Sequence, residues 1–149
     1  MARGGIRLGL VAFIGTVSLV ALALALAAGG VAAKAPIANA AARTVRVGLN
    51  EFSVRPKPRR TGSRSIRFRV HNAGTIRHEF VVIRTRRRAS RLRIKGSRAS
   101  ERGRVGKIRR FGPGRTRTLR LRLRRGHYAL ICNLPGHYEA GMHADFRVR

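Results

Sequence analysis

Apolar and arginine side chains alternate along several short stretches of this chain, and this alternation constrains the fold more than any other feature. Successive side chains of a β-strand point to opposite faces, so the alternation predicts strands with one buried face and one face in water. A β-branched run over residues 78–85 predicts one strand that is buried on both faces. The stretches expected as strands are residues 44–49, 65–71, 78–85, 116–124, 128–132 and 144–149.

Turn signals rich in glycine, proline and asparagine separate these stretches. They lie at residues 55–58, 60–62, 72–74, 112–114 and 125–126. Short strands between such turns, without a long amphipathic helix, predict an all-β fold in the form of an antiparallel β-sandwich. Residues 86–110 break the pattern because they are rich in Arg, Ser and Gly, and we expect them to form a loop insertion with room for a short helix over residues 89–94.

The first 40 residues resemble a targeting segment. Arg3 and Arg7 precede an uncharged stretch over residues 8–33, and small residues follow, with possible cleavage sites at residues 38–40 and 31–33. This pattern fits a cleaved signal peptide, but the apolar run is also long enough to remain as an N-terminal membrane anchor. Both alternatives predict that residues 41–149 form one extracytoplasmic domain, which is periplasmic, secreted or held on the outer face of the cytoplasmic membrane.

The chain is strongly basic, with 34 Lys and Arg residues against 5 Asp and Glu. Such charge predicts an anionic partner, either an acidic redox protein or an anionic membrane or cell-wall surface. A basic coat that only keeps a monomer soluble is the alternative. Nucleic acid is not expected as a partner, because the chain is exported and its aromatic content is 5%, without Trp.

Cys132 is the only cysteine, so it cannot form a disulfide within the chain. Taken alone it reads as a buried, inert thiol. However, His137 and Met142 follow it at even spacing, and His78 precedes the β-branched run. Thiolate, imidazole and thioether groups select copper over hard cations, and two His, one Cys and a weak axial Met make a blue-copper set. The residues therefore predict one copper ion per chain, bound by His78, Cys132, His137 and Met142.

The pattern Cys-x4-His-x4-Met, with an upstream His at a strand start, resembles that of the cupredoxin family, the small type 1 blue-copper proteins. The resemblance covers most of residues 43–149. It implies an eight-stranded Greek-key sandwich, a single type 1 copper and one-electron transport. It also implies that the edge of His137 faces solvent among small and apolar residues, including Leu134 and Pro135.

Glu79 departs from the family pattern, in which Asn or Ser often follows the first His. The role of its carboxylate is open, but its backbone N–H can still donate to the Cys132 sulfur. Leu134 keeps its N–H as well, since the proline of the loop is residue 135. We therefore expect two N–H donors to the thiolate, and these raise the reduction potential.

Other functions fit the residues less well. A copper delivery or storage module without electron traffic is the main alternative, and an adhesion protein with a vestigial site is a further one. Zinc is disfavoured because thioether is a poor zinc ligand. A hydrolase with Cys132 as nucleophile and His137 as base lacks an orienting group, so no enzyme is expected. His143 competes for a ligand role, whereas His71 and His127 read as surface residues.

Overall fold

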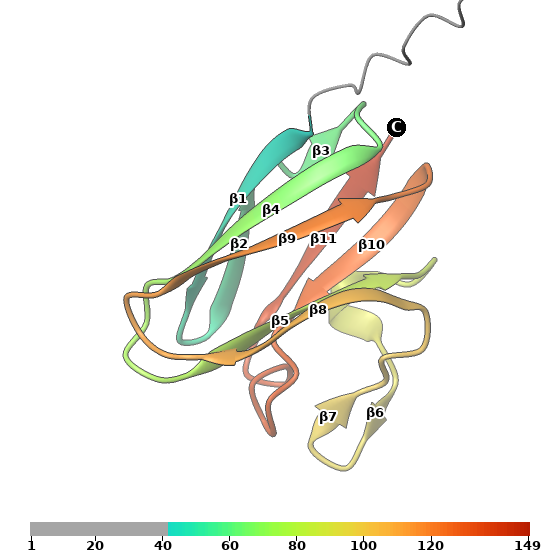
Figure 1. Cartoon of the computed structure of the whole chain (residues 1–149). Helices are drawn as coiled ribbons and strands as arrows, with labels where there is room; N and C mark the ends of the chain where they lie inside the picture. Colours follow the sequence, from blue (N-terminus) through green and yellow to red (C-terminus); the bar gives the residue numbers. More distant parts are fainter. Residues whose placement is uncertain (1–41) are drawn as a thin grey trace, which may run out of the picture. The chain divides into compact units, whose positions relative to one another are not determined.

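The computed structural model describes residues 42–149, which form two packed β-sheets (Figure 1). The signal-peptide or anchor prediction for residues 1–40 lies outside the described residues. Within residues 42–149 we find no helix that is long and apolar enough to cross a membrane.

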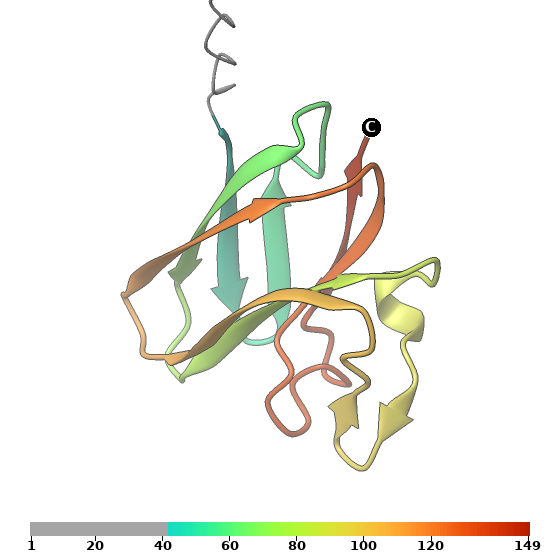
Figure 2. The ribbon, with the colours of Figure 1, turned by 45° about the vertical axis from the view of Figure 1, so that its right-hand side comes forward.

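One sheet has the strand order β2-β1-β4-β9 and the other β3-β11-β10-β5-β8, and β6 and β7 form a separate pair. The chain passes from one sheet to the other on either side of β3, between β4 and β5, and again on either side of β9 (Figures 1 and 2). The strands are β1 (Arg43–Asn50), β2 (Ser53–Lys57), β3 (Arg60–Thr61), β4 (Ser65–Asn72), β5 (His78–Arg84), β6 (Ile94–Lys95), β7 (Arg98–Ala99), β8 (Arg104–Phe111), β9 (Thr116–Arg122), β10 (Gly126–Ile131) and β11 (His143–Val148).

The predicted strands and the Greek-key β-sandwich are confirmed. In β4, Ile66, Phe68 and Val70 are buried and the arginines between them are exposed, as the alternation requires. In β5 every residue from His78 to Ile83 is buried, as expected for a strand covered on both faces.

The strands of this sandwich are not antiparallel throughout, as the expected antiparallel form would have them. β1 pairs with β4 in parallel, and β3 pairs with β11 in parallel, so both main sheets are mixed. Alternation along a strand determines which side chains face the core, but it carries no information about the direction of the neighbouring strand. The implied count of eight strands is also exceeded in the described residues, mainly through short strands at sheet edges.

Two expected turns are strands. Residues 53–57 form β2 despite Pro56, which is compatible with pairing because β2 lies at the edge of its sheet. Residues 60–61 form the short β3.

The expected loop at residues 86–110 is only partly a loop. It contains a 3-10 helix, η1 (Ala89–Arg91), in the region where a short helix was expected, followed by the β6–β7 pair. From Arg104 the chain forms β8, which pairs with β5 at the sheet edge. Because only Phe111 of β8 is buried, the strand has no period-2 signal that the sequence could reveal.

The main core lies between the two sheets. The rings of Phe68, Phe80 and Phe146 pack together there, with centroids 5.4 to 5.5 Å apart. Cys132 and Met142 belong to this core cluster. A second cluster lies on the other face of β5 and β10, where residues of the segment 86–110 cover these two strands. That cover explains why β5 is buried on both faces.

Candidate metal centre

Three of the four predicted ligands meet at one end of the sandwich. His78 is the first residue of β5, and Cys132 follows β10, which pairs with β5. The Cys132 Sγ atom lies 3.8 Å from Nδ1 of His78 and 3.6 Å from Nδ1 of His137. One donor atom from each residue lies within 4.8 Å of the others, which is the spacing that a single metal ion needs.

Met142 closes the same loop. The Cys132 N–H donates to the Met142 carbonyl at 3.0 Å, and the Met142 N–H donates to the His137 carbonyl at 3.0 Å. The Met142 side chain is fully buried in the core cluster that contains Cys132. The backbone bonds therefore fix the thioether residue directly beside the cysteine.

The Cys132 sulfur accepts hydrogen bonds from the backbone. The Glu79 N–H donates to Sγ at 3.4 Å, which confirms one of the two expected donors. Burial raises the pKa of the Cys132 thiol, and the N–H groups of Glu79 and Leu134 lower it in part. Among the described residues only the Glu79 N–H forms a hydrogen bond to this sulfur, and the second expected donor is supported by its effect on the pKa of the thiol alone.

Glu51 is a site residue that the sequence did not reveal. One of its carboxylate oxygens lies 2.9 Å from Nε2 of His78, and the same group accepts from the N–H groups of Thr75 and Ile76. Burial raises the pKa of Glu51, but these donors outweigh it and hold the pKa below its ordinary value. A carboxylate on the outer nitrogen of a ligand His fixes its tautomer and orients its ring, so Nδ1 is left for a metal.

His137 is half-buried, and burial and then the neighbouring His78 lower its pKa below the ordinary value. Its ring meets the edge of Phe52 with centroids 5.3 Å apart. Phe52 is 43% exposed, and Leu134 is half-buried. The surroundings of His137 are thus partly apolar, with an aromatic residue that sequence reasoning missed.

The segment 86–110 holds the ligand loop from the side (Figure 2). The buried Asn133 side chain accepts from the Ala99 N–H at 2.8 Å and donates to the Ala99 carbonyl and to Glu101. Gly136 donates to the Ser97 carbonyl at 2.9 Å. The insertion is therefore a structural support for the loop between Cys132 and Met142.

A second set of bonds joins the same two segments further along the loop. The buried Tyr138 hydroxyl donates to the Ala89 carbonyl at 2.7 Å and accepts from the Leu92 N–H at 2.9 Å.

In the described residues the ligand cluster includes none of His71, His127 and His143.

The donor set fits copper. Two imidazole nitrogens, one thiolate and a buried methionine on the same loop are soft or borderline donors, and the pair of N–H groups suits a thiolate that carries negative charge.

No family model matches the chain, and no curated protein matches it. Solved structures do match. A reduced auracyanin from Roseiflexus castenholzii is 18% identical, with 72% of this chain and 98% of that chain covered and a TM-score of 0.56. Auracyanin B is 18% identical, with 71% of this chain and 88% of that chain covered and a TM-score of 0.55. Rusticyanin from Thiobacillus ferrooxidans is 14% identical, with 71% of this chain and 77% of that chain covered and a TM-score of 0.51. The chain therefore has the cupredoxin fold, with a sulfur and two imidazoles gathered at one end.

Proposed function

We propose that this chain is an exported type 1 copper protein that carries single electrons and is not itself an enzyme. The observation that supports this most directly is the buried Cys132 Sγ, which lies within 4 Å of Nδ1 of both His78 and His137. The proposed ligands are these three groups and, as axial ligand, Met142. Export is inferred from the first 40 residues, and the similarity to auracyanin and rusticyanin supports the copper assignment.

When bound there, copper supplies a one-electron couple. The chain keeps its donors in place whichever oxidation state is present. Glu51 holds the His78 ring, the Glu79 N–H holds the sulfur, and the Asn133 side chain ties the ligand loop to the insertion. A site that moves little between two oxidation states needs little reorganisation for each transfer.

The burial of the site favours a carrier over the alternatives. Cys132 and His78 are fully buried, so a substrate cannot come close enough for the thiolate to attack it. A delivery protein must release its ion to a partner, which is easier from an exposed site than from one that is enclosed by the core.

Loading with Cu(II) tests the proposal. The wild-type protein is expected to turn intensely blue or green, with a narrow copper hyperfine splitting in the electron paramagnetic resonance spectrum, and to bleach reversibly on reduction. Cys132→Ser should abolish the colour, whereas His71→Ala, at an exposed histidine outside the cluster, should keep it. A colourless protein with a tetragonal copper spectrum would contradict the proposal.

A further inference from the structure

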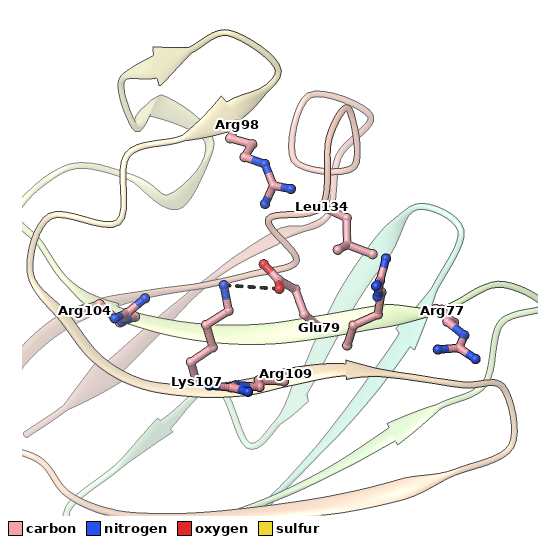
Figure 3. A pocket seen from close by; sticks show the side chains of 8 residues that line it. Arg77, Glu79, Arg98, Arg104, Lys107, Arg109 and Leu134 are labelled. Atoms are coloured by element: carbon pink, nitrogen blue, oxygen red, sulfur yellow. Dashed lines mark ion pairs between the residues drawn. The ribbon is translucent and has the colours of Figure 1, made fainter.

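A hollow of about 890 Å³ opens beside the ligand loop, between that loop, β7 and β8 (Figure 3). Leu134 and Glu79 form part of its wall. The other lining residues are all cationic, and we call this hollow the basic cleft. These residues are Arg77, Arg98, Arg104, Lys107, Arg109 and Arg110.

Part of this charge is already neutralised. Lys107 pairs with Glu79 at 3.2 Å and with Glu101 at 3.1 Å, and Arg104 also pairs with Glu101. Figure 3 marks the first of these pairs.

The remaining charge has no internal partner. Arg77, Arg109 and Arg110 are exposed, and in residues 42–149 they form no ion pair. The Arg98 side chain donates to the backbone carbonyl of Asn133 and forms no ion pair in the same residues. Several guanidinium groups around one concavity raise the local concentration of anions.

The basic cleft also contains an unused acceptor. Glu79 is 5% exposed, and its Oε1 atom is buried without a hydrogen-bond partner. Leaving a buried acceptor unpaired costs free energy. This oxygen has almost no contact with solvent, so the Glu79 carboxylate faces the cleft mainly through Oε2, which Lys107 already holds.

The cleft lies very close to the metal centre. The backbone N–H of Glu79 donates to the Cys132 sulfur, and Leu134 is two residues from that cysteine in the ligand loop. A group that is seated in the cleft is therefore separated from the thiolate by little more than one residue.

We propose that the basic cleft is the docking site for a carboxylate-rich segment of an acidic electron-transfer protein, an inference that rests on the function proposed above. Arginine guanidinium groups pair with carboxylates through two parallel hydrogen bonds, so a cluster of Asp and Glu side chains fits several of them at once. The concave shape favours a protruding protein segment over a flat membrane. A single free oxyanion would leave most of the guanidinium groups unpaired.

The first test measures binding without electron transfer. Titration calorimetry of the Cu(I)-loaded protein uses a hexaglutamate peptide as probe. The double variant Arg77→Ala/Arg109→Ala should weaken peptide binding by about tenfold, since each lost ion pair costs up to about 1 kcal/mol. The matched control is Arg46→Ala/Arg69→Ala, which removes the same charge from exposed positions on the other sheet. It should change binding by less than about twofold.

The second test measures electron transfer to a small polyanion. Hexacyanoferrate(III) takes one electron from the reduced protein and becomes hexacyanoferrate(II), while the protein is oxidised by one electron. We expect the rate of the wild-type protein to fall with rising salt. At a fixed salt concentration the cleft variant should be slower than the wild type, whereas the control variant should not. A cationic cobalt(III) phenanthroline oxidant should show no such loss.

Three outcomes would overturn the docking proposal: no peptide binding, equal effects of the two double variants, or binding of inorganic phosphate as tight as that of the peptide. A different observation would contradict the proposed function: a protein that does not form the blue site shows no colour after copper loading, in the wild type or in any variant.

Discussion

Replacement of Leu134 by proline removes the backbone N–H group that, together with the Glu79 N–H, lowers the pKa of the Cys132 thiol. These N–H groups withdraw negative charge from the thiolate. They stabilise the reduced site more than the oxidised one, since the reduced site carries one more electron. Leu134→Pro should therefore lower the reduction potential.

The size of the shift follows from the strength of such a bond. A hydrogen bond to a charged group contributes about 1.5–3 kcal/mol. The bond is made in both oxidation states, so only the difference between the states affects the potential. If about one third of the bond energy differs, the shift is ~0.5–1 kcal/mol, or ~20–40 mV for one electron.

The midpoint potential is measured by protein-film voltammetry or by redox titration of the visible band. Leu134→Ala is the matched control, because it removes the same apolar side chain but keeps the N–H. The reasoning requires a lower potential in the proline variant than in the alanine variant, with a narrow hyperfine splitting in both. Equal potentials in the two variants would show that this N–H does not tune the site.

Three other changes probe the supports of the site. Glu51→Ala, which frees the outer nitrogen of His78, should weaken copper binding about 10–100-fold in chelator competition, whereas Glu139→Ala at an exposed carboxylate should not. Asn133→Ala should lower the free energy of unfolding of the metal-free protein by about 1–3 kcal/mol. A loss below about 0.5 kcal/mol would show that the hydrogen bonds between Asn133 and Ala99 do not stabilise the ligand loop. Burial raises the pKa of the Cys132 thiol above its ordinary value of 9.0, so the metal-free protein should lose stability as pH rises above about 9. Over the same pH range the melting temperature of metal-free Cys132→Ala should fall less than that of the metal-free wild type.

The sequence predicted the parts of the molecule that side-chain alternation and ligand spacing can encode. The alternation located the strands that form the central part of both sheets, and the β-branched run identified β5 as the doubly buried strand. The even spacing of Cys132, His137 and Met142 identified one loop, and a single upstream His at a strand start indicated the residue that joins it. These signals are local, so a single chain is enough to read them.

The features that the sequence did not predict depend on contacts between distant segments. Glu51 lies in the turn between β1 and β2, and nothing nearby in the chain relates it to His78. The insertion buries only small residues such as Ala89 and Ala99, so its composition reads as a solvated loop. Its hydrogen bonds to Asn133 arise from tertiary packing, which alternation does not report.

Three of the five acidic residues of this chain lie around the metal centre. With 34 basic residues available, five acidic side chains could pair with cations almost anywhere on the surface. Instead Glu51 holds a ligand histidine, and Glu101 accepts from Asn133, the residue after Cys132.

Glu79 completes this arrangement, because its N–H bonds the thiolate while its carboxylate holds Lys107. Each of these three acids therefore fixes a donor or the loop that carries one, and the surface arginines remain free to attract anions. A basic surface and an ordered metal centre are thus compatible in this chain because three of the five acidic residues support the centre, whereas Glu139 is exposed and Asp145 pairs with His127.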